Sequence, residues 1–241
     1  MISMAATFVC TKVTPVSGER TELSSDWTLS REGASEQYAA TVPSTVAGTL
    51  YDNGFFGQDL LEGRNYEQVD KSIFDEVWTY RTTFAGKPAR GQHTELVFDG
   101  LGYYADVFLN GKQIASSDTT AGVFIRRAYD VTGLLKANNK LEVKLRRAQK
   151  GDLNIGFVDW NPRPLDESMG IVRPVTLHTT GAVSIEDVYV IPDLDVETFA
   201  TADLKVRVRL CNRESRPVEA VLGLELEGGN ASVPVTLLAA V

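Results

Sequence analysis

Strict alternation of apolar and charged side chains is the feature that most limits how this chain can fold. In residues 140–146 every second residue is apolar and the residues between are charged, and residues 204–210 follow the same pattern. A period of two places one row of side chains against a core and the other in water, as in a half-buried β-strand. Further strands are predicted at residues 77–84, 95–98, 105–109, 175–179, 187–191 and 220–226.

Turn and helix signals agree with an all-β fold. Asn110-Gly111 separates two strand-like runs, and this dipeptide tolerates the positive φ angles of a two-residue hairpin. The one clear helix signal predicts a short helix that is capped by Ser44 or Thr45 and ends at Asn53-Gly54. Many short strands with little helix favour a β-sandwich or jelly roll over a parallel sheet.

A domain boundary is expected near Gly181. Residues 1–181 are predicted to form the jelly roll, and residues 182–241 hold a plainer series of strands separated by turn residues. An immunoglobulin-like sandwich needs about 100 residues and seven strands, so the second segment matches only the first part of one. An incomplete sandwich exposes unpaired strand edges, which predicts poor order or self-association of residues 182–241.

Composition excludes several functions. The chain has 24 Lys and Arg against 32 Asp and Glu, a net charge of −8, whereas nucleic-acid binding through phosphates needs clustered basic residues. No stretch approaches the roughly 20 apolar residues of a membrane span. His93 and His178 lack neighbouring ligands for a metal site, and no cofactor is expected. Cys10 and Cys211 read as free thiols, although one disulfide between them stays open.

The most distinctive segment is residues 156–164, where two aromatics, an acid, an amide and two prolines interrupt the strand pattern. Prolines hold such a loop extended, and an aromatic face beside a carboxylate is the combination that recognises sugars. On the residues alone, an equally good interpretation is a structural loop in which Trp160 fills a core and Asp159 caps a turn.

Six segments in order resemble the N-terminal sugar-binding domain of glycoside hydrolase family 2. They are Val77-Trp78-Thr79-Tyr80-Arg81-Thr82-Thr83-Phe84, Leu96-Val97-Phe98-Asp99-Gly100-Leu101, Ala105-Asp106-Val107-Phe108-Leu109-Asn110-Gly111, Tyr129-Asp130-Val131-Thr132, Asn139-Lys140-Leu141-Glu142-Val143 and Gly170-Ile171-Val172-Arg173-Pro174-Val175. The loop Asp159-Trp160-Asn161-Pro162-Arg163-Pro164 is most similar to the branch of exo-β-D-glucosaminidases and mannosylglycoprotein endo-β-mannosidases. Val172 departs from the aromatic residue common in that branch.

The resemblance implies a galactose-binding-like jelly roll, then an immunoglobulin-like sandwich, then a catalytic (β/α)₈ barrel that carries both catalytic glutamates of a retaining glycosidase. We expect this chain to stop before the barrel, to hold no catalytic residue and to be inactive alone. By the same resemblance, Asp159 would bind sugar hydroxyls or an amino group, Trp160 would wall the subsite, and Asn161 is a further candidate. Asn65 resembles another sugar-binding position, but a turn role is the stronger interpretation of this asparagine. Arg173 is interpreted as a buried or interface arginine paired with a carboxylate, which would make it structural.

The sequence is compatible with three functions. The chain is predicted to be the non-catalytic part of a family 2 β-glycosidase that lends a loop to the active site. Alternatively, it is an autonomous carbohydrate-binding module, or a scaffold that only packs against the barrel. The expected partners are a β-linked glycan and the downstream barrel, with no nucleic acid and no membrane. No signal peptide is visible, and an extracytoplasmic location follows only from the habit of the family.

Overall fold

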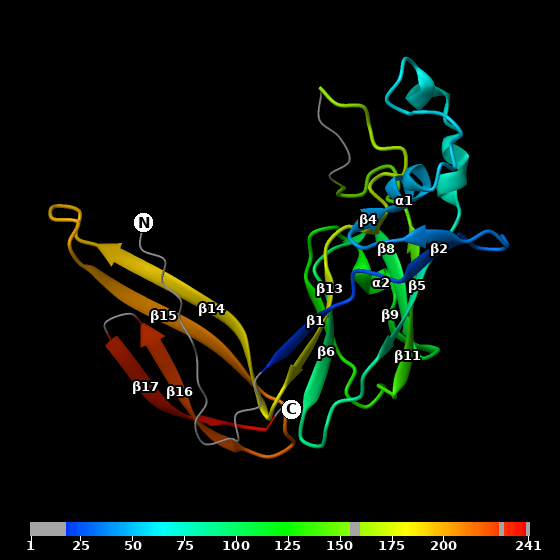
Figure 1. Ribbon diagram of the computed structural model, residues 1–241. Coiled ribbons are helices and arrows are strands. Elements are labelled where there is room, and N and C mark those ends of the chain that lie inside the picture. Colours follow the sequence, from blue (N-terminus) through cyan, green and yellow to red (C-terminus); the bar gives the residue numbers. More distant parts are fainter. Residues whose placement is uncertain (1–17, 155–159, 227–228, 240–241) are drawn as a thin grey trace. The chain divides into compact units, whose positions relative to one another are not determined.

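The computed structural model describes residues 18–154, 160–226 and 229–239 (Figure 1). Cys10 and Asp159 therefore lie outside the described residues. The contacts within the chain separate two compact units. The larger unit comprises residues 20–88 and 94–178, and the smaller one contains the strands that follow residue 182.

The larger unit is a sandwich of two main sheets with a small third sheet at one end. Its six-stranded sheet has the order β3 (Tyr38–Ala40), β2 (Trp27–Arg31), β5 (Trp78–Ala85), β11 (Asn138–Arg146), β8 (Tyr104–Leu109), β9 (Lys112–Ala115). The four-stranded sheet has the order β1 (Glu19–Glu22), β13 (Val175–Thr180), β6 (His93–Phe98), β10 (Arg127–Asp130). The small sheet has the order β4 (Ser44–Thr45), β12 (Gly170–Ile171), β7 (Leu101–Gly102).

The core lies between the two main sheets. Tyr80 and Val143 from the six-stranded sheet pack in the same buried cluster as Leu96 and Phe98 from the four-stranded sheet. Along β11, Leu141, Val143 and Leu145 are buried, while the residues between them form the outer face. The alternation in the sequence therefore predicted correctly which side of this strand meets the core. All the other predicted strands are also present; the strand predicted at residues 77–84 is shifted by one residue, to Trp78–Ala85, and the rest are longer than predicted by one to several residues.

The predicted hairpin and helix are confirmed. Asn110 and Gly111 have φ angles of 53° and 83° and connect β8 to β9, whose Leu109 and Lys112 lie opposite each other. Helix α1 spans Val46–Asp52, and Thr45 is its N-cap, with the side-chain oxygen accepting a hydrogen bond from the Gly48 amide. Gly54 (φ 69°) takes the left-handed conformation just beyond the helix. Two 3₁₀ turns follow, η1 (Asn65–Gln68) and η2 (Lys71–Asp75).

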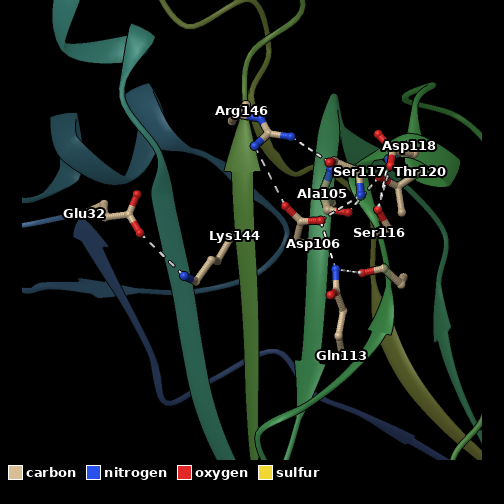
Figure 2. A network of polar contacts seen from close by, with 11 residues as sticks. Glu32, Ala105, Asp106, Gln113, Ser116, Ser117, Asp118, Thr120, Lys144 and Arg146 are labelled. Atoms are coloured by element: carbon tan, nitrogen blue, oxygen red, sulfur yellow. Dashed lines mark hydrogen bonds and ion pairs between the residues drawn. The ribbon is translucent and has the colours of Figure 1, made fainter.

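A short helix, α2 (Ser117–Thr120), is fastened to strand β8 by polar contacts (Figure 2). Thr120 Oγ1 accepts a hydrogen bond from the Ala105 amide and donates one to the Ala105 carbonyl, both at 2.8 Å. Asp106 Oδ1 accepts from the Ser117 amide at 2.8 Å, and Arg146 donates to Ser117 Oγ at 2.6 Å. The start of the segment that follows α2 is therefore fixed in position relative to the sheet.

The smaller unit contains two antiparallel ribbons, β14 (Val183–Leu194) with β15 (Ala202–Asn212) and β16 (Val218–Leu226) with β17 (Gly229–Leu237). Val188 lies opposite Val208 on one side of the first ribbon, and Asp187 forms an ion pair with Arg209 at 3.1 Å on the other. Within the described residues each ribbon has two strands, so each strand has one edge without a strand partner. Identification of this unit as the first part of an immunoglobulin-like sandwich stays a prediction, as does its self-association.

In the described part of the chain, no helix combines the length and the apolar character needed to cross a membrane. Cys211 is a free, half-buried thiol.

A buried asparagine joins three segments of the larger unit. Asn139, 2% exposed, donates its side-chain amide to the carbonyls of Gly86 and Lys136, both at 2.9 Å. Its Oδ1 accepts from the Lys136 amide at 2.8 Å and from the Asn110 side chain at 2.9 Å. Since Asn110 forms the β8–β9 turn, this hub holds the hairpin against the start of β11.

Replacing Asn139 with Ala should lower the free energy of unfolding by about 3 kcal/mol, because several buried polar groups lose their partner at once. Urea unfolding at equilibrium measures this loss. Asn138→Ala is the matched control, since Asn138 is the exposed neighbour in the same strand, and a change within about 0.5 kcal/mol is expected there. Equal losses in the two variants would refute the role of Asn139.

Candidate functional site

The loop that precedes strand β12 is held against the start of helix α1. The first three amides of α1 each donate a hydrogen bond outside the helix: Val46 to the Met169 carbonyl at 2.7 Å, Ala47 to Asp166 Oδ2 at 2.7 Å and Gly48 to Thr45 Oγ1 at 3.1 Å. A helix leaves these amides without partners of its own, so the loop satisfies two of them. Two hydrogen bonds therefore join the loop to the start of the helix.

Asp166 is the centre of this contact. Its side chain is almost completely buried, and Oδ1 also accepts from the Ser168 amide at 3.0 Å. Burial raises the pKa of the Asp166 carboxyl, and the hydrogen bonds from Ala47, Thr45 and Ser168 only partly oppose this rise. The amides at the helix start also favour the negative charge, since the N-terminus of a helix carries partial positive charge.

A second set of contacts fixes the outer part of the loop. Tyr66, in η1, donates its hydroxyl to the Arg163 carbonyl at 2.6 Å, and Arg163 forms an ion pair with Glu167, also at 2.6 Å. Asn154 donates to the Glu167 carbonyl at 3.0 Å. Burial, and then the negative charge of Asp166, raises the pKa of Tyr66 and keeps its hydroxyl a donor.

The backbone of the loop is under strain at its turn. Glu167 and Ser168 have φ angles of 55° and 60°, in the left-handed region that residues with a side chain rarely adopt. Such a conformation persists where surrounding contacts over-determine it. The hydrogen bonds of Asp166 to Ser168 and of Asn154 to Glu167 supply those contacts.

The structure places three of the four predicted sugar-binding residues. Trp160 is 81% exposed and Asn161 is also exposed, so the interpretation in which Trp160 fills a core is wrong. Asn65 donates its side-chain amide to the Asp59 carbonyl at 2.8 Å, the contact expected of a turn residue. Its neighbour Tyr66 brings η1 against the loop that carries Trp160 and Asn161. A sugar-binding role for any of these residues stays a prediction.

Sequence reasoning missed the residues that hold the loop. Neither Asp166 nor Tyr66 is among the candidate residues that the sequence indicates. An acid two residues before a serine is the signal of a local turn, which could have indicated the Asp166–Ser168 hydrogen bond. Its contact with Ala47 spans 119 positions and has no local signal. Within the described residues, no group of three or more His, Cys, Asp and Glu side chains could hold a metal ion.

The two stacked main sheets define the class of the larger unit as a β-sandwich of the jelly-roll type. Residues 27–156 match the family described as the glycosyl hydrolase 2 galactose-binding domain-like domain. The chain belongs to this family. The resemblance to glycoside hydrolase family 2 that the sequence motifs predicted is thus confirmed.

Individual relatives point to the same branch. An exo-β-D-glucosaminidase of Hypocrea jecorina is 36% identical over 210 residues, which is 85% of this chain and 24% of that protein. A mannosylglycoprotein endo-β-mannosidase of Lilium longiflorum is 31% identical over 221 residues, 78% of this chain and 22% of that protein. The crystal structure of the exo-chitosanase CsxA of Amycolatopsis orientalis superposes with a TM-score of 0.83 at 27% identity, covering 92% of this chain and 28% of that one. The chain thus spans about a quarter of the length of these relatives.

The titration of Asp166 predicts how stability depends on pH. A carboxyl whose pKa is raised on folding stabilises the folded state most below its ordinary pKa of 3.8, and this contribution is lost as the pH rises through the raised value. The free energy of unfolding of the unmodified protein, minus that of Asp166→Asn, should therefore fall as the pH rises above 3.8. Urea unfolding at a series of pH values measures the difference.

Asp70→Asn is the control for this slope. Asp70 is exposed, and hydrogen bonds from Ser72 lower its pKa, so its contribution is retained at high pH and lost only on acidification. Its difference should be flat or should rise with pH. A difference for Asp166→Asn that rises in the same way would show that burial does not dominate this site.

The hydrogen bond from Tyr66 predicts local protection of the loop. Tyr66→Phe removes the bond to Arg163 at the cost of about 1 kcal/mol, the typical net contribution of one hydrogen bond. We expect amide hydrogen exchange in residues 160–168 to accelerate by about fivefold while exchange in β11 stays unchanged. Equal exchange in this loop before and after the substitution would contradict the anchoring role of Tyr66.

Proposed function

We propose that this chain is the non-catalytic N-terminal part of a retaining family 2 β-glycosidase of the exo-β-D-glucosaminidase or β-mannosidase type. Its loop at residues 159–161 forms one wall of a sugar pocket whose catalytic glutamates belong to a (β/α)₈ barrel outside these 241 residues. The observation that carries the proposal is the combination of an 81% exposed Trp160 with a loop anchored at Asp166 and Tyr66. The relatives and the span of the matches support it further.

The exposed indole is available to a ligand in this proposal. A partner that covers the Trp160 ring gains the favourable burial of its apolar surface. The C–H face of a pyranose is such a partner, because it is flat, apolar and bordered by hydroxyls. Asn161 follows directly and offers an amide that can both donate to and accept from those hydroxyls.

In the same proposal, Asp159 contributes a negatively charged carboxylate to the sugar pocket. A carboxylate beside the aromatic wall accepts hydrogen bonds from hydroxyls and pairs more strongly with the ammonium group of an amino sugar. In a retaining mechanism the barrel provides a nucleophile and an acid/base carboxyl about 5 Å apart. The role left to this chain is to bind and orient the sugar, which holds the scissile bond in place for those two groups.

Turnover by the full-length enzyme tests the role of Asp159. Asp159→Asn should lower kcat/KM for a nitrophenyl β-glucosaminide by about 100-fold and for a β-mannoside by about tenfold or less, because only the amino sugar loses an ion pair. Trp160→Ala should lower both by about tenfold. Leu153→Ala is the control, since Leu153 is 91% exposed just before this segment. Losses no larger than in the control would favour a scaffold role.

The 241-residue chain itself distinguishes the remaining alternatives. It should release no nitrophenol from β-glucosaminide, β-mannoside or β-galactoside, because the carboxyl pair of a retaining site is supplied elsewhere. It should also bind glucosamine and mannose too weakly to saturate, as expected of half a pocket. Saturable binding of either sugar that is abolished by Trp160→Ala would instead favour an autonomous carbohydrate-binding module.

A further inference from the structure

The larger unit has a surface pocket whose described lining residues lie outside the proposed sugar loop. Its volume is about 490 Å³, and it is lined by Asp99, Phe124, Arg126, Arg173 and Pro174. These residues come from the end of β6, from the segment between α2 and β10 and from the segment between β12 and β13. The pocket brings two guanidinium groups, a carboxylate and an aromatic ring together.

One wall of the pocket is held by a buried arginine. Arg127 is only 9% exposed and donates to the carbonyls of Ala121 at 2.8 Å, Gly122 at 3.2 Å and Ile125 at 2.9 Å. Burial lowers the pKa of Arg127, and the three carbonyls offset part of the cost of burying its charge. The contacts of α2 with β8 fix the other end of the same segment (Figure 2). The segment that carries Phe124 and Arg126 is therefore held in position from both ends.

The floor of the pocket is formed by the stem of Arg173. A Cβ atom on Gly100 would lie 2.7 Å from Arg173 Cγ and 2.9 Å from the Val123 carbonyl oxygen, so the stem lies closely over a glycine backbone. The guanidinium of Arg173 lies over the Phe124 ring at 5.3 Å from its centre. Arg173 is exposed and forms no ion pair within the described residues, so it is not a buried, paired arginine; pairing with a carboxylate across an interface stays a prediction.

The pocket carries an excess of positive charge. Asp99 is shared by Arg126 and Arg20, each at a loose 3.7 Å, and Arg173 adds a third guanidinium. The lining of the pocket therefore holds two guanidinium groups, of Arg126 and Arg173, against one carboxylate, on a chain whose net charge is −8. Phe124 is 55% exposed, so its ring is open to a ligand. A complementary ligand has one carboxylate and one flat apolar face.

We propose that this pocket binds a sugar acid, a hexuronate at the end of an acidic glycan. The carboxylate of the sugar pairs with Arg173 and Arg126, because a guanidinium matches a carboxylate in charge and in planar geometry. The C–H face of the ring covers Phe124, and Asp99 accepts a hydrogen bond from a ring hydroxyl. This assignment is independent of the function proposed for the loop at residues 159–161, because it uses none of its residues.

Calorimetric titration of the 241-residue protein with glucuronate, glucose and acetate tests the proposal. Glucuronate should bind with a dissociation constant of about 1 mM, the strength that a ligand of this size reaches through a few good contacts. Glucose and acetate should each bind at least tenfold more weakly, since one lacks the charge and the other lacks the ring. Binding should weaken when the salt concentration rises from about 50 to about 300 mM. Equal binding of acetate and glucuronate, or no saturable binding of glucuronate, would overturn the proposal.

Variants locate the site. Arg173→Gln and Phe124→Ala should each weaken glucuronate binding by about tenfold. Arg90→Gln removes the same charge from an exposed position outside the pocket and should leave binding unchanged. Thermal unfolding confirms that each variant is folded, and Phe124→Ala still decides the question if Arg173→Gln is not, since more than half of the Phe124 side chain is exposed. Equal loss in Arg90→Gln, or retained binding in Phe124→Ala, would show that glucuronate does not occupy this pocket.

Discussion

The hydrogen bond between the Ala47 amide and the buried carboxylate of Asp166 is the contact on which the candidate site depends. It joins the start of α1 to a loop 119 positions further along the chain, and the Val46–Met169 bond lies beside it. Without these two bonds the first turn of α1 would leave two amides unsatisfied. The same contact therefore stabilises the fold and positions the loop.

The sandwich holds helix α1, one partner of this contact, in a fixed position. Tyr80, in the middle of β5, forms a hydrogen bond with Thr49 of α1 at 3.0 Å, and Thr49 donates to Ser44 of the small sheet at 3.1 Å. Since Tyr80 is completely buried in the core, helix α1 is fixed relative to the six-stranded sheet. The loop is thus attached to a helix that is itself attached to the core. The Trp160 side chain takes no part in the hydrogen bonds that connect the core, helix α1 and the loop, so its exposure to water does not weaken them.

Sequence alone predicted the parts of this arrangement that follow from local rules. The alternation in residues 140–146 gave the buried face of β11, and Asn110-Gly111 gave the hairpin, because both depend on the geometry of adjacent residues. The resemblance of the motifs to family 2 then identified the jelly roll. Contacts between distant segments could not be predicted, since nothing near Asp166 or Tyr66 indicates Ala47 or Arg163 as a partner. The contact of Arg173 with Phe124 has the same character, since the sequence neighbours of Arg173 gave no sign of a ring 49 positions earlier.

Rigidity explains why a separate sandwich is suited to the role proposed for it. A wall residue helps catalysis only where the sugar it binds is held in one position, because a displacement of about 1 Å from productive geometry can cost about 100-fold in rate. A loop held only by its own turns opens locally at little cost in free energy. Here the carboxylate of Asp166, the hydroxyl of Tyr66 and the side-chain amide of Asn154 bind the loop at separate points. Each of them comes from, or reaches to, a different segment of the sandwich, so the position of Trp160 follows from the whole fold and not from the loop sequence.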